Sequence, residues 1–248
     1  MQKLLVIIPT YNEAENIAEM LQRVMELPSH FHVLVVDDNS PDGTARIVGA
    51  TEREFPGKIH LLEREGKLGL GTAYLAGFEW ALHRNYDYVF EMDADFSHNP
   101  KHLERLYSKA KEGYDVVVGS RYIKKGRIVD WPLDRLILSY GASMYARLIT
   151  GLPVKDPTAG FVVYNEGFLR QLDMNRIDSI GYAFQIEMKY AAYSHGFSLA
   201  EVPITFMDRQ RGVSKMDSSI IKEAALGVIK MRLRKKGKYL KVPQSISV

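Results

Sequence analysis

Short runs of apolar residues alternate, along the first half of the chain, with longer stretches in which apolar positions recur every three or four residues. The short runs predict buried strands, and the longer stretches predict helices that cover a sheet. The expected strands are residues 4–8, 33–36, 59–63, 88–92 and 116–119, and the expected helices are residues 13–25, 44–55, 70–85 and 101–111. This order predicts an α/β fold with a mostly parallel central sheet flanked by helices, in which ligands bind beyond the carboxyl ends of the strands.

The pattern changes after Ser120. Residues 127–152 combine apolar positions with Trp131, Arg135 and Arg147, which predicts amphipathic helices and not another strand–helix unit. The remaining expected elements are strands at 160–164 and 199–203, a helix at 184–194, a basic amphipathic helix at 217–241 and a flexible tail at 242–248. Residues 1–216 are therefore expected to form one catalytic or binding domain, with the basic helix attached to its end.

Composition and charge restrict the class of protein. Of the 248 residues, 46% are hydrophobic and 25% are charged, which is typical of a soluble globular chain. The net charge of +3 is too small to indicate a nucleic-acid-binding protein. The chain has no cysteine, which excludes disulfides and cysteine nucleophiles and favours a reducing compartment, with the cytoplasm as the expected location. No apolar stretch is long enough to predict a membrane-spanning helix.

Two carboxylates follow the expected strand 88–92 with one residue between them. Asp93 and Asp95 leave the sheet together and point the same way. Mg²⁺ and Mn²⁺ prefer oxygen ligands and are often held by one or two carboxylates together with substrate phosphates, so the pair predicts a metal–diphosphate site. The alternative is a pair of surface acids in a turn or helix cap, which is the commoner outcome for an isolated pair of this kind.

A second acidic cluster follows the expected strand 33–36. An acid in this position binds ribose or base groups in nucleotide-binding sheets, so Asp37 and Asp38 are predicted to be functional. Asp42 and Thr44 are good turn and helix-cap residues and are predicted to be structural.

Two glycine-containing loops are candidates for binding phosphate. The loop at residues 66–71 precedes a helix and carries Lys67, but it lacks the third glycine of a dinucleotide fingerprint. The loop from Arg209 to Lys215 combines arginine, which binds phosphate in a bidentate manner, with lysine. A solvated run of charge is the alternative for this second loop.

Seven segments, taken together, resemble one enzyme family. They are Ile8-Pro-Thr-Tyr-Asn-Glu13, Val36-Asp-Asp-Asn-Ser-Pro-Asp-Gly-Thr44, Gly69-Leu-Gly-Thr-Ala73, Met92-Asp-Ala-Asp-Phe-Ser-His98, Gly119-Ser-Arg-Tyr122, Asp156-Pro-Thr-Ala-Gly-Phe161 and Asp208-Arg-Gln-Arg-Gly-Val-Ser-Lys-Met216. In this order they resemble the dolichol-phosphate mannosyltransferases, also called polyprenol monophosphomannose synthases, of the inverting family 2 glycosyltransferases. The resemblance covers about residues 1–216 and implies the GT-A fold.

The resemblance implies transfer of mannose from GDP-mannose to polyprenyl or dolichyl phosphate, with Mg²⁺ or Mn²⁺ as cofactor. By motif position it assigns donor binding to Pro9, Tyr11, Glu13, Asp37, Asp38, Asp93, Asp95, Gln185, Glu187, Arg209 and Lys215. Of these, it assigns the metal to Asp93 and Asp95, and catalysis to Asp95, Arg209 and Lys215. It assigns the acceptor phosphate to Arg121, Arg135 and Ser139. Some members carry a glutamine metal ligand where this chain has Ser97, so Ser97 is not expected to be a ligand.

A phosphate acceptor is already anionic near neutral pH, so no strong general base is expected. If the acceptor were a sugar alcohol, the base would be sought among Asp156, Glu187 and His98. Two alternatives stay open, namely a polyprenyl-phosphate glucosyltransferase that uses UDP-glucose and a catalytically silent nucleotide-binding membrane scaffold.

A lipid acceptor also predicts contact with a membrane. Many family members carry transmembrane helices after the catalytic domain, and none is predicted here. The amphipathic region 127–152 and the basic helix 217–241 are therefore expected to place the protein peripherally on the cytoplasmic face of a membrane, or a membrane-anchoring subunit is expected to do so.

Overall fold

The computed structural model describes residues 2–208, 218–234 and 239–241. Its main sheet contains β1 (Leu4–Thr10), β2 (His32–Asp37), β3 (Ile59–Glu63), β4 (Tyr88–Glu91), β5 (Val116–Ser120), β7 (Val162–Asn165) and β8 (Leu199–Pro203), in the order β3-β2-β1-β4-β7-β5-β8. Every neighbouring pair is parallel except for the two pairs that β7 makes with β4 and β5. A parallel pair of short strands, β6 (Arg127–Val129) and β9 (Thr205–Met207), lies beside the main sheet.

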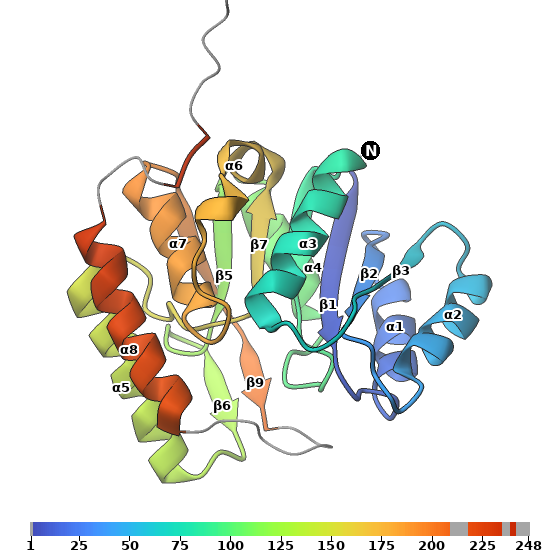
Figure 1. Cartoon of the computed structure of the whole chain (residues 1–248), viewed down its shortest axis with the longest axis horizontal. Coiled ribbons are helices and arrows are strands. Elements are labelled where there is room, and N and C mark those ends of the chain that lie inside the picture. Colours follow the sequence, from blue (N-terminus) through green and yellow to red (C-terminus); the bar gives the residue numbers. More distant parts are fainter. Residues whose placement is uncertain (1, 209–217, 235–238, 242–248) are drawn as a thin grey trace, which may run out of the picture.

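Helices cover both faces of the sheet (Figure 1). One face carries α3 (Leu70–His83), α6 (Glu166–Gln171) and α7 (Phe184–Ser194), and the other carries α1 (Ile17–Met25), α2 (Thr44–Glu54) and α4 (His102–Ala110). A short 3₁₀ turn, Met174–Arg176, follows α6. At one end of the sheet, α5 (Leu133–Thr150) and α8 (Ser218–Leu233) pack side by side (Figure 1). Within the described parts of the chain, no helix combines the length and hydropathy of a membrane span.

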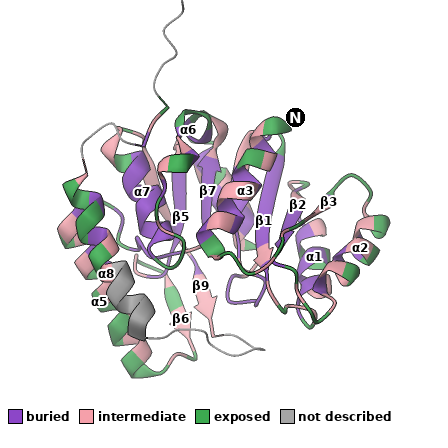
Figure 2. Ribbon diagram, in the orientation of Figure 1, coloured by how far each residue is buried: buried purple, intermediate pink, exposed green. Residues whose placement is uncertain are grey.

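The side chains of β1 alternate between the two helical layers. Leu5 and Ile7 belong to the core beneath α3 and α7, whereas Leu4, Val6 and Ile8 belong to the core beneath α1 and α4. All five are buried, and Figure 2 shows the central strands as the most continuously buried part of the molecule. A strand buried on both faces has no polar alternation, which is why the sequence predicted it from a continuous apolar run.

A glycine brings α3 close to the central strand. A Cβ atom placed on Gly77 would lie 2.7 Å from Cδ1 and 2.9 Å from Cγ2 of Ile7. Gly77→Ala is therefore expected to lower the free energy of unfolding by about 1–3 kcal/mol through overpacking. Denaturant unfolding of Gly77→Ala and of the double variant Gly77→Ala with Ile7→Val would measure this effect. Valine removes Cδ1 but keeps Cγ2, so Gly77→Ala is expected to cost less stability when measured against Ile7→Val than when measured against wild type. An equal cost in both backgrounds would contradict the contact with Cδ1 as the cause.

Three predictions of local structure need correction. Residues 127–129 form strand β6, and α5 is the single helix in the region where amphipathic helices were predicted. The first helix begins at Ile17 and not at residue 13, because a turn in which the Asn16 N–H donates to the Glu13 carbonyl comes first. At the other end of the chain, α8 ends at Leu233, and the expected tail at 242–248 lies outside the described residues.

The antiparallel strand β7 brings a loop to the binding edge of the sheet. Because β7 runs against its neighbours, its start, and not its end, lies at the carboxyl ends of β4 and β5. The Gly119 N–H donates to the Phe161 carbonyl at 2.8 Å at this point. Residues 156–161 thereby reach the edge where Asp93 and Asp95 leave the sheet.

Candidate active site

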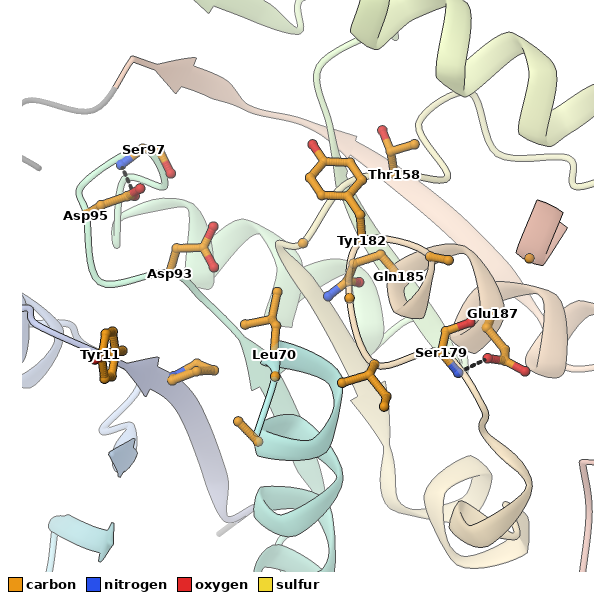
Figure 3. A pocket seen from close by; sticks show the side chains of 18 of the residues that line it. Tyr11, Leu70, Asp93, Asp95, Ser97, Thr158, Ser179, Tyr182, Gln185 and Glu187 are labelled. Atoms are coloured by element: carbon orange, nitrogen blue, oxygen red, sulfur yellow. Dashed lines mark hydrogen bonds between the residues drawn. The ribbon is translucent and has the colours of Figure 1, made fainter. Parts of the chain in front are cut away.

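A cavity of about 860 Å³ opens at the carboxyl ends of the strands, a size typical of a small-molecule site (Figure 3). It brings together ten of the residues predicted from the sequence, which are Pro9, Tyr11, Glu13, Asp38, Asp93, Asp95, Arg121, Arg135, Gln185 and Glu187. The expected edge of the sheet is therefore the edge that forms a pocket.

Two predicted site residues do not line the cavity. Asp37 is fully buried, and its carboxylate accepts hydrogen bonds from Thr10 Oγ1 at 2.7 Å and from the Ser40 N–H at 2.8 Å. Ser139 on α5 accepts a hydrogen bond from the Tyr122 hydroxyl at 2.8 Å. Arg209 and Lys215 lie outside the described residues, so their predicted roles stay predictions.

Asp38 and Tyr11 form the end of the cavity beside β1 and β2. Arg64 forms an ion pair with Asp38, with Nη2 and Oδ1 2.5 Å apart. The Leu68 N–H donates to the other carboxylate oxygen of Asp38, which ties the 66–71 loop to β2. Lys67 of this loop lies with Nζ 5.1 Å from the centre of the Tyr11 ring. An aromatic ring, a carboxylate and a lysine therefore meet where a nucleoside is expected.

The acidic pair after β4 provides the oxygen ligands expected for a divalent cation. Asp93 and Asp95 both line the cavity, and Asp95 Oδ1 accepts the Ser97 N–H at 3.1 Å (Figure 3). The buried hydroxyl of Ser97 has no hydrogen-bond partner among the described residues, which leaves a further oxygen unsatisfied beside the pair. Burial lowers the pKa of His98 to about 4, so its ring is neutral near pH 7 and does not repel a cation. This donor set fits Mg²⁺ or Mn²⁺.

Arg121 is paired with a carboxylate inside the protein. Its Nε and Nη2 donate to the two oxygens of Asp156, each at 2.7 Å, and Nη2 also donates to Thr158 Oγ1 at 2.8 Å. Burial alone would raise the pKa of Asp156, but the charge and the hydrogen bonds of Arg121 together outweigh burial and hold that pKa below its ordinary value. Arg121, which was predicted to bind the acceptor phosphate, thus already has a carboxylate partner within the protein.

Arg135 and Arg121 both lie near the ring of Trp131. The two guanidinium carbons lie 4.1 Å (Arg135) and 5.7 Å (Arg121) from the Trp131 ring centre. Arg135 Nη1 also pairs with Asp208 at 2.6 Å, and its side chain is 28% exposed, against 4% for Arg121. Arg135 is therefore the more accessible of the two arginines to a ligand in the cavity.

Glu187 holds the far wall of the cavity together. One carboxylate oxygen accepts the Ser179 N–H at 2.8 Å, and the other accepts hydrogen bonds from Arg234 at 2.5 Å and from the Tyr239 hydroxyl at 3.1 Å. Arg234 also pairs with Asp178. These contacts fasten the end of α8 to the segment before α7, so the carboxylate of Glu187 is engaged within the protein.

Residues 178–183 form a wall of the cavity that the sequence did not predict. The Gly71 N–H donates to the Ile180 carbonyl at 2.7 Å, so this N–H is not available to an anion. A Cβ atom on Gly71 would lie 2.7 Å from the Ser179 carbonyl oxygen. The only signal for this contact in the sequence is the pair Gly69 and Gly71, which lies in the loop that the sequence analysis interprets as a candidate for binding phosphate.

Comparisons with known proteins show the family of the chain. Residues 5–173 match the sequence model of the protein family that is called Glycosyl transferase family 2. The polyprenol monophosphomannose synthase of Mycolicibacterium smegmatis is 46% identical over 94% of this chain and 88% of its own length. The undecaprenyl-phosphate mannosyltransferase of Micrococcus luteus is 43% identical over 93% of this chain and 94% of its own length.

Solved structures show the same fold at lower sequence identity. Glucosyl-3-phosphoglycerate synthase from Mycobacterium tuberculosis, crystallised with Mn²⁺, UDP and phosphoglyceric acid, superposes with a TM-score of 0.68 at 18% identity. The match covers 98% of this chain and 80% of that chain. It confirms the predicted GT-A fold, and the extent of the family match, together with the two relatives, shows that the chain belongs to glycosyl transferase family 2.

Proposed function

We propose that this protein transfers mannose from GDP-mannose to the phosphate of a polyprenyl phosphate, with inversion at the anomeric carbon. The observation that carries the proposal is that each of the three candidate bases has a partner within the protein. Asp156 is paired with Arg121, Glu187 with Arg234, and the neutral ring of His98 accepts the Asp93 N–H through Nδ1 at 3.2 Å. With all three engaged, the cavity suits an acceptor that arrives already anionic, as a phosphate does.

The two relatives that cover nearly the whole chain support the same reaction. One is named as a polyprenol monophosphomannose synthase and the other as an undecaprenyl-phosphate mannosyltransferase. Both names combine a mannosyl group with a polyprenyl phosphate, and neither states the nucleotide of the donor. GDP-mannose as the donor is what the resemblance of the sequence motifs implies.

On the donor side, Tyr11, Glu13 and Asp38 would bind the nucleoside, and Asp93 and Asp95 would hold a divalent metal ion against the diphosphate. A metal ion in that position neutralises charge that develops on the leaving diphosphate. Arg209 and Lys215, outside the described residues, would add positive charge at the diphosphate.

On the acceptor side, Arg135 would bind the phosphate at the open side of Trp131. A dianionic phosphate would compete with Asp208 for the guanidinium of Arg135, which is accessible enough to exchange partners. Arg121 is already paired with Asp156, so Arg135 is the arginine proposed to contact the phosphate.

Transfer of labelled sugar into detergent-dispersed polyprenyl phosphate tests the proposal. GDP-mannose and UDP-glucose are supplied in parallel, with Mg²⁺, with Mn²⁺ and with a chelator. Metal-dependent labelling of the lipid from GDP-mannose is the expected result. Labelling from UDP-glucose alone would replace the donor, and binding of nucleotide without transfer from either donor would favour a silent scaffold.

We further propose that α5 and α8 dock on a lipid surface. Their outward apolar side chains are Leu133, Ile137, Leu138, Tyr140, Met144 and Leu148 on α5, and Leu226, Ile229 and Leu233 on α8. On α5 these recur at helical spacing, and Leu226 also lines the cavity, so the apolar surface is continuous with the mouth of the site. Lys230 and Arg232 of α8 are exposed beside it and would attract anionic headgroups.

Ile137→Asp and Leu148→Asp are each expected to reduce binding to vesicles of phosphatidylcholine and phosphatidylglycerol about tenfold. Each removes an apolar side chain from the surface that would enter the lipid and adds a charge that opposes the anionic headgroups. Co-sedimentation with the vesicles measures binding. Tyr193→Asp is the matched control, because Tyr193 is an exposed aromatic residue on α7. Equal loss in the control and the two test variants would contradict docking through α5.

A further inference from the structure

A lysine is buried beneath the cavity wall. Lys189 on α7 has no exposed surface, and its ammonium group donates to the Ala159 carbonyl at 2.7 Å, the Gln185 carbonyl at 2.9 Å and Gln185 Oε1 at 3.1 Å. Three acceptors match the three donors of an ammonium group. Since burying a charge is costly, such a lysine is expected to serve a purpose beyond filling space.

The side chain of Gln185 connects this lysine to the strand that carries the acidic pair. Gln185 Nε2 donates to Glu91 Oε2 at 2.7 Å, and Glu91 is the last residue of β4, two positions before Asp93. Gln185 also lines the cavity. Its amide group therefore has protein partners on one side and the cavity on the other (Figure 3).

Lys189 fixes the orientation of the amide. Its ammonium group can only donate, so it requires the oxygen of Gln185, and the nitrogen of the amide then faces Glu91, to which it donates. A flipped amide would place its NH₂ group against the ammonium group. With Glu91 bound to one N–H, the second N–H of Nε2 is the donor that remains for a ligand.

The position of Gln185 indicates which part of the donor it would meet. Figure 3 shows Asp93 between the Tyr11 end of the cavity and Gln185, with Asp95 farther from Gln185. If the nucleoside lies at Tyr11 and the diphosphate at the acidic pair, the sugar extends towards Gln185.

We propose that Lys189 is a positioning residue for the sugar of the donor. It holds the Gln185 amide so that Nε2 donates to an oxygen of the hexose, while Glu91 fixes the same amide from β4. This inference rests on the proposed function for the identity of the sugar nucleotide.

Lys189→Met tests the proposal, because methionine keeps an unbranched apolar side chain and lacks the ammonium group that donates hydrogen bonds to Gln185. Affinity for GDP-mannose is expected to fall about tenfold more than affinity for GDP, both measured by calorimetry with Mn²⁺ present. Phe168→Leu is the matched control, since Phe168 is equally buried in the core that contains α7 and does not line the cavity. Loss of the two affinities in equal proportion, as in a merely destabilised protein, would overturn the proposal.

An exchange of two residues tests the Gln185 donor, on which the role of Lys189 depends, even if Lys189→Met does not fold. In the double variant Glu91→Gln with Gln185→Glu, the new glutamine donates to the new carboxylate, which still accepts from Lys189. The amino-acid composition and the pairing are kept, and the N–H that faces the cavity is lost. We expect the double variant to have a thermal midpoint close to that of wild type and to lose the preference for GDP-mannose over GDP. Retention of that preference would overturn the proposal.

The wild-type protein separates this inference from the proposed function. If wild type transfers glucose from UDP-glucose and not mannose, the proposed donor is wrong, and the same variants are compared on UDP-glucose and UDP. Suppose that wild type transfers mannose and that the ratio of the affinities for GDP-mannose and GDP is the same in the variants as in wild type. The proposed function then stands, and the proposed role of Lys189 is contradicted.

Discussion

Replacing Asp95 with asparagine is expected to reduce sugar transfer at least about a thousandfold while leaving the fold intact. The substitution removes one of the two carboxylates proposed to hold the metal ion, and loss of charge stabilisation at a leaving group has effects of this size. The fold survives because the Oδ1 atom of asparagine can still accept the Ser97 N–H, as Asp95 does at 3.1 Å. Initial rates of lipid labelling at saturating donor, together with the thermal midpoint, measure both parts of the prediction.

Glu26→Gln provides the control for this experiment. It removes one carboxylate charge from an exposed position at the end of α1, away from the cavity, and is expected to leave the rate unchanged. Activity of Asp95→Asn within tenfold of wild type would show that the acidic pair does not hold a catalytic metal.

Asp156→Ala is expected to have the largest effect on stability, lowering the free energy of unfolding by about 3–5 kcal/mol. It leaves Arg121 buried without the carboxylate that accepts its Nε and Nη2 at 2.7 Å, and a buried charge without its partner is strongly destabilising. The double variant Arg121→Met with Asp156→Leu is expected to recover much of this loss, because it removes both charges. Urea unfolding of the two variants and wild type measures the difference.

The effect of Asp156 depends on pH in a defined direction. The pKa of Asp156 is lower in the folded protein than its ordinary value of 3.8, so its stabilisation is fully present above that value. It is lost as the pH falls through the lower, folded-state pKa. The difference in stability between wild type and Asp156→Ala is therefore expected to be constant from pH 5 to 7 and to shrink below about pH 4. A difference that shrinks instead on going from pH 5 to 7 would contradict the ion pair as its source.

The elements of the main sheet could be predicted because burial on two faces leaves a clear pattern. The strand from Leu4 onward is a continuous apolar run, and α1 shows apolar residues at helical spacing. Strand β6 could not be predicted, because its three residues are paired with β9, far along the chain, and short strands carry little local signal. The antiparallel direction of β7 is likewise a property of its partners and not of its own residues.

The candidate site was predictable where a residue follows a strand. Asp38, Asp93 and Asp95 line the cavity for that reason, and Asp42 is structural as predicted, since it accepts the Ala14 and Thr44 N–H groups at 3.0 Å. Asp37 shows the limit of the rule. Neighbouring side chains on a strand point to opposite sides, so Asp38 faces the cavity and Asp37 is buried beneath it.

Contacts between distant segments could not be predicted from local patterns. The sequence indicated that Arg121 and Arg135 would find anions, but it could not show that Asp156 and Asp208 would supply them. Lys189 was not recognised at all. The available signal was its spacing of four residues from Gln185 on one helix, which places both on the same face.

The direction of β7 also sets an order of assembly for the chain as it is synthesised. Strands β1 to β4 can pair with one another as they emerge, but β5 has no partner until β7 has been made and inserted beside β4. Until the ribosome passes Asn165, the edges of both β4 and β5 stay open, and open strand edges pair readily with other chains. A nascent chain of this protein therefore has its period of greatest exposure to aggregation in the middle of its synthesis, when the acidic pair is already in place and the loop that completes the site is not.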